Sequence, residues 1–405
     1  MRGISSGFVL VFLFTLLVEV LGYLGITQLL YDRLWKKRIS GLYLLFSLFF
    51  LGFFLYAFGN PDTIRETGDY GFFYFVIFIS TLNLVPKLVL SVFVLLASPF
   101  RLKRDKTLAH RIVLGGLILS FGVILCLGAG YVIGKNRIQI REISLNVSGL
   151  PSQLEGLKFV QLSDLQLGSF QNDRLLRRMV RQINRVNADL ILFTGDLVNN
   201  FSREAVGFEE ELLALSASSG KYAILGNHDY GDYSDWPTAV QKQNNRELIK
   251  KKIRDSGFTL LLNQTTRISM CDTAIYLTGV ENWGHPPFPQ YARLDKALSN
   301  VPEHAFQILM THDPAHWNAQ VIGQTTIQLT LSGHTHGGQF AVRLAGLSFS
   351  PIRLKSPEWG GLYKKNGQFL YVNRGFGCVG LPARIDMAPE ITVFDLHASE
   401  NTKTR

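Results

Sequence analysis

Hydrophobic positions are distributed unevenly along the 405-residue chain, and the first third differs from the rest. Four long apolar runs occupy residues 7–30, 41–58, 71–97 and 112–134. Each run is near the roughly 20 residues that a helix needs to cross the hydrocarbon core of a bilayer. We therefore predict that residues 1–137 form an all-α transmembrane region with four helices.

Two of the apolar runs contain charged residues. Glu19 lies in the first run, and Lys87 follows Pro86 in the third. Isolated charges at this depth need partners, so the two residues either mark a transport pathway or pair with each other across helices. Pairing explains them at least as well as transport. Because no small-residue cleavage site follows the first run, a membrane anchor is favoured over a cleaved signal peptide.

From about residue 138, short apolar strands alternate with amphipathic helices. Predicted strands at 157–164 and 188–196 flank a predicted helix at 173–186, which makes a βαβ unit. Residues 138–405 are therefore predicted to form one large layered domain of the α/β or α+β class. Further strands are predicted at 221–229, 274–282, 305–313, 327–336, 368–375 and 390–396.

Composition supports a membrane segment and weakens a nucleic-acid hypothesis. Hydrophobic residues make up 47% of the chain and charged residues only 18%, which fits a chain that lies partly in lipid. The formal net charge is +10, but residues 1–134 alone hold 12 Lys and Arg against 6 Asp and Glu. The excess charge is thus largely in short loops, and we expect no nucleic-acid partner.

The charge of these loops predicts the orientation of the helices. Residues 32–38 and 101–111 are rich in Lys and Arg, whereas residues 60–70 are acidic. Basic short loops stay in the cytoplasm, so the acidic loop and the soluble domain are expected outside the cytoplasmic membrane of a bacterium. Three basic residues after the fourth run argue weakly for the opposite orientation: Lys135, Arg137 and Arg141.

Five predicted strands end in side chains that can bind metal ions. The carboxyl ends of strands in such sheets converge on one crevice, so these side chains are expected to meet. Carboxylate, amide oxygen and imidazole together suit Mn²⁺, Fe²⁺ or Zn²⁺, and their number exceeds one tetrahedral site. A two-metal centre is therefore predicted. The residues are Asp164, Asp196, Asn227, His228, Asp229, His312, His334 and His336.

A two-metal centre of this kind is suited to phosphoryl chemistry. Two ions about 3.5–4 Å apart can activate a water molecule and stabilise an in-line displacement at phosphorus. Gly195, Gly226 and Gly333 each precede a predicted ligand, and glycine lets the backbone turn sharply and approach a metal or phosphate. A single "TGD" or "THD" is usually a turn, but "GNHD" and "GHTH" place polar clusters directly after apolar strands, where a core would exclude them.

The order of these motifs resembles that of the calcineurin-like metallophosphoesterases. Asp164, "GD" at 195–196, "GNHD" at 226–229, His312 and "GHTH" at 333–336 match the family pattern, and the resemblance covers about residues 155–397. "LSGHTHGGQ", "LYVNRGFG" and "PEITVF" are similar to the membrane-associated bacterial branch that includes alternative UDP-2,3-diacylglucosamine pyrophosphatase and YkuE-like enzymes. The resemblance implies an α/β (α+β) sandwich of two mixed sheets flanked by helices.

The resemblance also implies a role for each residue. Asp196 would bridge two divalent ions, with Mn²⁺ favoured over Fe²⁺, Zn²⁺ or Mg²⁺. His228 would face the phosphate as a catalytic residue, and Asp229 would orient its ring. The other ligands divide into Asp164 and His336 for the first metal, and Asn227, His312 and His334 for the second.

One position departs from the family pattern. The usual first motif is Asp-x-His, but this chain has Asp164-Leu165-Gln166. A glutamine oxygen is a neutral and harder ligand than imidazole, so the first metal is expected to bind more weakly or to be a harder ion. Two hypotheses remain: a working enzyme with a modified first site, which the other intact ligands favour, and a degenerate site that only binds or senses a ligand.

The substrate is predicted from context. Residues 340–361 mix apolar side chains with Arg343, Arg353 and Lys355, which suits a lipid phosphate, although packing of these residues into the core is an equal alternative. We expect a membrane-anchored phosphodiesterase or pyrophosphatase acting on a phosphorylated lipid or other envelope phosphate. A cytoplasmic domain would instead favour cleavage of UDP-diacylglucosamine.

Overall fold

The computed structural model describes residues 6–58, 67–286, 288–344 and 347–399. By its internal contacts the chain divides into two units. The helical unit comprises residues 1–63, 72–131 and 380–383, and the two-sheet unit comprises residues 64–71, 132–379 and 384–405. The short segment just before residue 72 therefore belongs to the two-sheet unit, although it lies between two predicted membrane helices.

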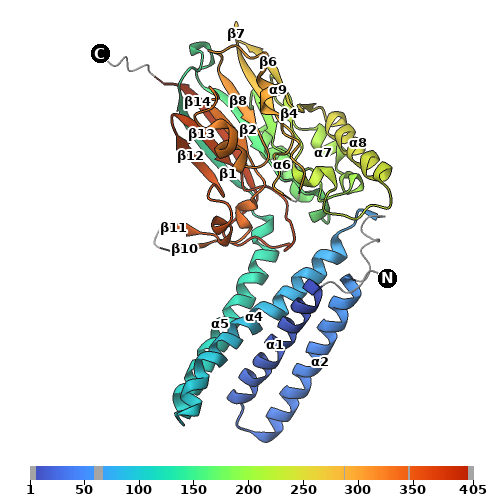
Figure 1. Cartoon of the computed structure of the whole chain (residues 1–405), viewed down its shortest axis with the longest axis vertical. Coiled ribbons are helices and arrows are strands. Elements are labelled where there is room, and N and C mark those ends of the chain that lie inside the picture. The colour runs from blue at the N-terminus through green and yellow to red at the C-terminus, as the bar shows by residue number, and fades with distance from the viewer. Residues whose placement is uncertain (1–5, 59–66, 287, 345–346, 400–405) are drawn as a thin grey trace, which may run out of the picture. The chain divides into compact units, whose positions relative to one another are not determined.

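Each of the four apolar runs coincides with a long helix (Figure 1). Three segments are long and apolar enough to cross a membrane: Phe12–Leu29, Gly71–Leu102 and Lys106–Asn136. The second run is also helical, but the side chains of its last five residues lie outside the described part of the chain. The helices are α1 Ser6–Leu29, α2 Arg33–Phe58, α4 Gly71–Leu102 and α5 Lys106–Val132.

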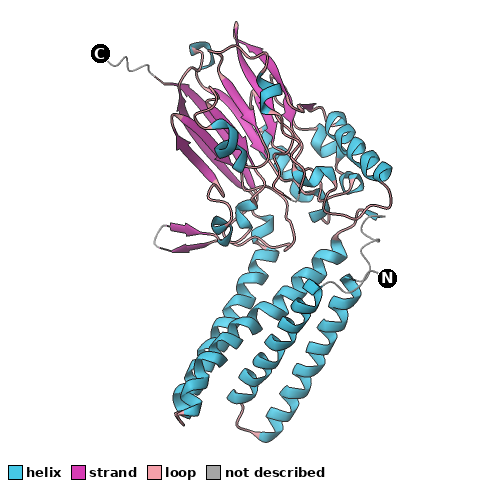
Figure 2. Cartoon of the chain, viewed as in Figure 1, coloured by secondary structure: helices cyan, strands magenta, loops and turns pink. Residues whose placement is uncertain are grey.

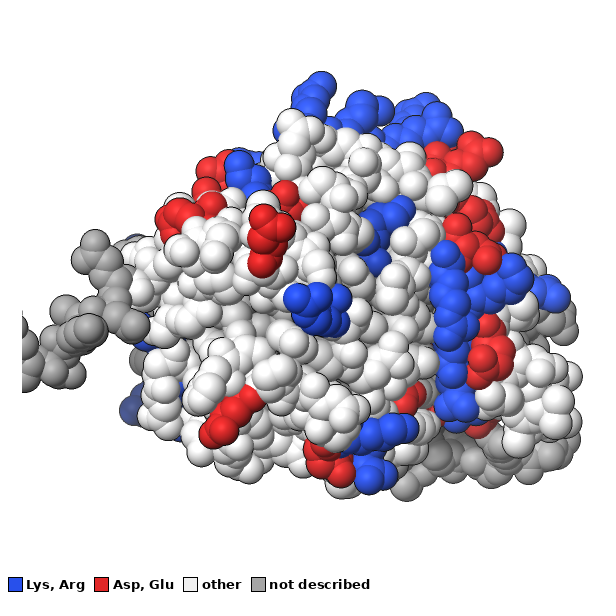
Figure 3. Space-filling view, turned by 90° about the horizontal axis from the view of Figure 1, so that it is seen from above, with Lys and Arg blue, Asp and Glu red and all other residues white. Residues whose placement is uncertain are grey.

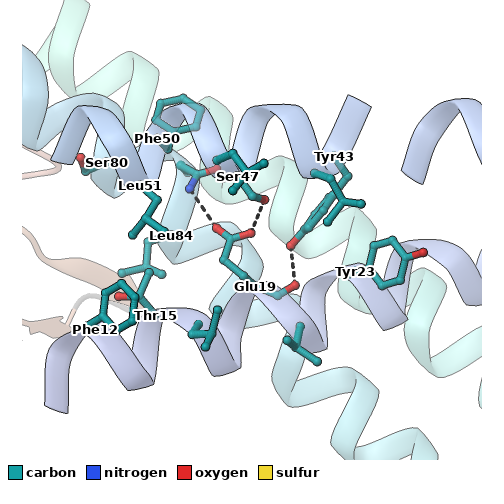
Figure 4. Close-up of a pocket in the computed structure, with 15 residues that line it drawn as sticks. Phe12, Thr15, Glu19, Tyr23, Tyr43, Ser47, Phe50, Leu51, Ser80 and Leu84 are labelled. Atoms are coloured by element: carbon teal, nitrogen blue, oxygen red, sulfur yellow. Dashed lines mark hydrogen bonds between the residues drawn. The ribbon is translucent and has the colours of Figure 1, made fainter. Parts of the chain in front are cut away.

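Glu19 on α1 and Lys87 on α4 form an ion pair within the helical unit. Figure 4 shows the other side chains around Glu19. The Lys87 ammonium lies 2.8 Å from both carboxylate oxygens of Glu19. Ser47 on α2 and Asn83 on α4 also donate hydrogen bonds to this carboxylate. A cavity of about 310 Å³ borders Glu19, and each side chain of the pair is 15% exposed. The pairing therefore joins α1, α2 and α4.

Removing one partner of this pair is predicted to destabilise the helical unit more than removing both. Lys87→Met leaves the Glu19 carboxylate unpaired, and breaking a buried pair typically costs about 3–5 kcal/mol. In the double variant Glu19→Gln/Lys87→Met both sites are neutral, so most of this loss should be recovered. Thermal unfolding in detergent measures the effect, with Lys106→Met as an exposed control. Equal or additive losses in the single and double variants would contradict the prediction.

The two-sheet unit contains two six-stranded mixed sheets and a small hairpin (Figure 2). The first sheet has the order β1-β14-β2-β3-β4-β5, with β1 Gln139–Val147, β14 Glu390–Ala398, β2 Leu157–Leu162, β3 Leu190–Phe193, β4 Lys221–Ala223 and β5 Thr259–Leu260. The second has the order β12-β13-β9-β8-β7-β6, with β12 Gly361–Lys365, β13 Gln368–Val372, β9 Leu329–Ser332, β8 Gln307–Met310, β7 Thr273–Gly279 and β6 Gln264–Met270. The hairpin consists of β10 Val342–Leu344 and β11 Leu347–Phe349.

The sheets pack face to face and helices cover their other faces. One apolar cluster takes residues from both sheets, including Phe159, Ile308 and Phe394. A second cluster packs the outer face of the first sheet against α6 Arg174–Asn184, α7 Glu209–Leu213 and α8 Ala239–Asp255. A third involves α9 Leu294–Leu298 and the turn at Trp317–Val321. The predicted sandwich of two mixed sheets flanked by helices is confirmed.

Most of the predicted strands begin near the correct residues but extend too far, whereas the strand predicted at 390–396 continues to Ala398. The strand predicted at 188–196 ends at Phe193, and the one predicted at 221–229 ends at Ala223. The residues beyond these ends turn out of the sheet, which is where the candidate ligands lie. On the face seen in Figure 3, Lys and Arg are interspersed with Asp and Glu instead of forming one basic surface.

Candidate metal centre

Two carboxylates and an imidazole from three strand ends form a compact buried group. Asp164 follows β2, Asp196 follows β3 and His312 follows β8. The candidate ligand atoms of these three residues all lie within 4.8 Å of one another. His312 Nε2 is 3.2 Å from Asp196 Oδ2 and 3.9 Å from Asp164 Oδ1. The geometry is therefore suited to a cation held between the two sheets.

The remaining predicted ligands border this group on two sides. His336 Nε2 lies 3.3 Å from Asp164 Oδ1. His334 Nδ1 and Asn227 Oδ1 are only 2.7 Å apart, and the His334 ring packs edge to face on the His312 ring. The structure thus brings the ligands predicted from the sequence together around Asp164, Asp196 and His312.

Several buried atoms in the group have no hydrogen-bond partner among the described residues. They are His312 Nε2, His336 Nε2 and Gln166 Oε1. Buried polar atoms are normally satisfied, so unsatisfied atoms that surround two carboxylates need an explanation. His312 Nδ1 donates to the Thr194 carbonyl at 2.7 Å, so Nε2 is the ring nitrogen that faces the carboxylates and could bind a cation once it has lost its proton. The donor set therefore fits divalent cations.

The backbone is strained at the candidate ligands. Asp164, Gln166, Asp196, His334 and His336 all have positive φ angles, between 47° and 72°. Residues with side chains rarely adopt this conformation, and clusters of it are typical of functional sites. At these positions, which follow the ends of β2, β3 and β9, it allows the chain to turn while the side chains converge.

The glycines before the ligands are needed for close packing. A Cβ atom on Gly333 would collide with the Asp164 carboxylate, and one on Gly226 would collide with Asp196. Gly195 has φ 94°, and a Cβ there would collide with the backbone at Gly226. These glycines therefore permit close packing around the two carboxylates, while their predicted approach to a metal or phosphate stays a prediction.

Electrostatics at the site favour a cation. Burial raises the pKa of Asp164. Burial would also raise the pKa of Asp196, but His312 and His228 outweigh burial and lower it. Burial alone would lower the pKa of His312, but Asp196 and Asp164 raise it to about 10. The proton on His312 thus supplies positive charge that a divalent cation could supply in its place.

The amide of Gln166 lies beside the central carboxylate. Its Nε2 donates to Asp196 Oδ2 at 2.9 Å, and its Oε1 is the unsatisfied atom noted above. A half-turn about the terminal bond exchanges these two atoms and would direct the oxygen toward the metal group. Gln166 is completely buried, so its placement is compatible with a ligand role.

His228 occupies the edge of the group, as predicted, but its ring is oriented by an unexpected partner. Its backbone N–H donates to Asp196 Oδ1 at 2.9 Å. Its Nδ1 donates to the backbone carbonyl of Asn199 at 2.6 Å, which leaves Nε2 available to a substrate. The Tyr233 ring stacks on the His228 ring with centroids 4.5 Å apart.

The expected role of Asp229 in orienting the His228 ring is wrong. The Asp229 carboxylate instead accepts hydrogen bonds from four backbone N–H groups, those of Asp196, Leu197, Val198 and Gly226. Burial and then Asp196 raise its pKa to about 7, whereas the four donors favour the charged form. Asp229 therefore holds the loops after β3 and β4 together.

Comparison with known proteins agrees with this geometry. A family model described as calcineurin-like phosphoesterase matches residues 157–338. The chain is 31% identical over 305 residues to the uncharacterized metallophosphoesterase YkuE of Bacillus subtilis (strain 168), a match that covers 73% of this chain and 99% of that protein. The chain belongs to the calcineurin-like phosphoesterase family. This phosphoesterase is therefore a metal-dependent hydrolase of phosphoric esters.

Two further relatives match the calcineurin-like phosphoesterase. It is 29% identical over 242 residues to phosphodiesterase YaeI of Escherichia coli (strain K12), covering 59% of this chain and 82% of that protein. It is 30% identical over 264 residues to a transmembrane protein with metallophosphoesterase domain of Danio rerio. That match covers 63% of this chain but only 56% of that protein. Together with the apolar helices, the match to the Danio rerio protein indicates a membrane protein.

Two residues at the phosphoesterase site were not predicted from the sequence. Arg384 is completely buried and donates to the backbone carbonyls of Arg374, Gly377 and Met387. Burial and then Arg384 hold the pKa of His336 well below its ordinary value, so its imidazole is neutral, as a ligand must be. Tyr233 is the second. Neither belongs to a motif that sequence analysis can recognise.

Proposed function

We propose that the protein is a membrane-anchored phosphodiesterase or pyrophosphatase with two divalent metal ions, acting on a phosphorylated lipid or another envelope phosphate. The observation that carries the proposal is the set of unsatisfied imidazole and amide atoms around Asp164 and Asp196. The first metal would be held by Asp164, Gln166, Asp196 and His336. The second would be held by Asp196, Asn227, His312 and His334.

The metal ions would activate water and stabilise charge at phosphorus, and His228 would act on the leaving group. His228 Nε2 is free because Nδ1 is engaged by the Asn199 carbonyl. In its imidazolium form, a histidine held in this way carries a proton on Nε2, which it can donate to the oxygen that leaves phosphorus. The stacked Tyr233 ring limits rotation of His228 and so preserves that direction.

The lipid substrate is supported by the surface that follows the last ligand strand. Val342 and Phe349 on the β10–β11 hairpin are exposed, and Leu354 is 85% exposed. Arg353 and Lys355, on either side of Leu354, are also exposed. Exposed apolar side chains next to cations are typical of surfaces that bind anionic lipids. Trp359 is buried, so part of residues 340–361 does pack into the core.

The proposed topology has four spans with the two-sheet unit outside the cell. Residues 67–71 belong to the two-sheet unit, so the loop before α4 and the residues after α5 lie on the same side. If α4 and α5 each cross the membrane once, the chain returns to the side from which α4 started, which agrees with this placement. Labelling of cysteines introduced after residue 140 in intact cells tests the side; protection of these positions would place the unit in the cytoplasm.

Purified protein supplied separately with Mn²⁺, Mg²⁺, Zn²⁺ or Fe²⁺ tests the proposed activity. We expect metal-dependent hydrolysis of bis-p-nitrophenyl phosphate, and of at least one lipid phosphodiester or pyrophosphate presented in vesicles. Hydrolysis of the soluble ester alone would refute the lipid substrate. The absence of metal-dependent turnover with every metal would favour the second candidate, a ligand-binding module with a degenerate site. That candidate rests on Gln166, and a metal content well below two equivalents per chain would support it.

Gln166→His is predicted to strengthen binding of the first metal. Imidazole is a softer and stronger ligand than an amide oxygen for zinc or iron, so the metal preference should move toward these ions. Metal titration by calorimetry, with Mn²⁺ and Zn²⁺ compared, measures the change. Gln153→His, at an exposed position, is the matched control. Unchanged affinity and preference in Gln166→His would show that residue 166 is not a ligand.

A further inference from the structure

A buried glutamate organises the loop that orients His228. The Glu204 carboxylate accepts hydrogen bonds from the backbone N–H groups of Gly168, Asn199, Asn200 and Phe201, at 2.5–3.2 Å. Burial raises its pKa to about 8, whereas the four donors favour the charged form. The loop that Glu204 holds, residues 199–201, contains the Asn199 carbonyl that accepts from His228 Nδ1.

Tyr70 packs on the same loop, although it comes from a distant part of the chain. It immediately precedes α4 and is only 7% exposed. Its hydroxyl accepts a hydrogen bond from Asn200 Nδ2 at 3.1 Å, and its ring lies 6.3 Å from the Phe201 ring. Tyr70 therefore contacts both residues that follow Asn199.

Gly168 shows how tightly these groups are packed. A Cβ atom at this position would lie 2.6 Å from Glu204 Oε2, 2.7 Å from Tyr70 Cδ2 and 2.9 Å from Asn199 Oδ1. Side chains do not approach at such distances, so the three groups close around the glycine. A shift of Tyr70 or Glu204 would therefore displace the loop.

We propose that Tyr70 and Glu204 are positioning residues for His228, which they fix through the loop at residues 199–201. Glu204 holds the backbone of the loop, and Tyr70 closes it from the side of the segment that leads into α4. This inference rests on the proposed function, because it assigns the proton transfer to His228. It also means that the segment between two membrane helices completes the active site.

A simpler account is that Tyr70 only anchors the start of α4, since tyrosine is common at membrane interfaces. The two accounts differ in what happens when His228 is absent. If Tyr70 only positions His228, replacing Tyr70 should not change the rate of a His228→Asn variant. If Tyr70 anchors α4, replacing it should still lower stability and rate in that variant.

The test is a double-mutant cycle in the full-length protein, with Tyr70→Ala, Tyr70→Phe and His228→Asn. We expect Tyr70→Ala to lower kcat by about 10- to 100-fold, as for other residues that orient a functional group, with KM and metal content unchanged. Tyr70→Phe keeps the ring and should recover part of the loss. The loss should be larger for diphenyl phosphate than for bis-p-nitrophenyl phosphate, because the more basic phenolate depends more on protonation.

The outcomes separate this inference from the proposed function. Tyr70→Ala should have no further effect once His228 is replaced. Losses that multiply in the double variant would overturn the positioning role while leaving the phosphoesterase activity intact. A wild-type protein without metal-dependent turnover would overturn the proposed function and this inference with it. Tyr276→Phe on β7 is the control. Glu204→Gln replaces an acceptor oxygen by an N–H₂ group that faces backbone N–H donors, so it should lower kcat as Tyr70→Ala does.

Discussion

Asp196→Ala is expected to abolish metal-dependent turnover and to reduce the metal content from two equivalents per chain to one or none. Asp196 is buried, lies within 3.2 Å of His312 Nε2, and is the carboxylate to which Gln166 also donates. A carboxylate shared by two ions cannot be lost without affecting both. The effect should therefore exceed that of replacing any other single ligand.

Mass spectrometry of the purified variant measures the metal, and initial rates with bis-p-nitrophenyl phosphate measure the activity. Asp196→Asn keeps the shape of the side chain and should lose metal in the same way, which separates a ligand role from a packing role. Asp255→Ala removes an exposed carboxylate from α8 and is the matched control, since such surface pairs contribute little. Full metal content or unchanged turnover in Asp196→Ala would refute the metal centre.

His228→Asn is expected to lower kcat by about 10²- to 10⁴-fold, the usual contribution of a general acid or base. His228 contacts Asp196 only through its backbone N–H, so both metal ions should remain bound. The loss should grow as the leaving group becomes more basic, because protonation then contributes more to the transition state.

The comparison of bis-p-nitrophenyl phosphate with diphenyl phosphate measures that dependence. His304→Asn replaces an exposed histidine in the same unit and should have no effect on either ester. A loss of metal in His228→Asn would instead assign His228 to the ligand set. An equal loss on both esters would argue against proton transfer to the leaving oxygen.

The pattern of apolar and polar residues along the chain was sufficient to predict most of the helices and the layered sheets. Apolar runs near 20 residues long predict the long helices, and short apolar strands ending in polar clusters predict the layered sheets. The ends of the strands were predicted too far along the chain. Asp164 and Asp196 adopt positive φ angles that take the backbone out of the sheet, and hydrophobic periodicity does not report backbone conformation.

The structure brings the candidate ligands together, while the contacts around them were not predicted. Asp229 was expected to orient His228, yet a backbone carbonyl, that of Asn199, does so. Every residue has a backbone carbonyl, so no sequence motif can reveal this role. Gln166 was recognisable as a departure from the family pattern, but only its position beside Asp196 shows that its amide reaches the metal group.

The sequence by itself therefore determined the apolar helices, the layered domain and the set of candidate ligands, because each depends on residues close together in the chain. Tertiary structure decided which distant residues meet. Glu19 pairs with Lys87 across 68 positions, and Tyr70 reaches Asn200 across 130. Such contacts depend on how helices and strands pack, and a tyrosine before an apolar run looks the same in the sequence whether it faces lipid or completes an active site.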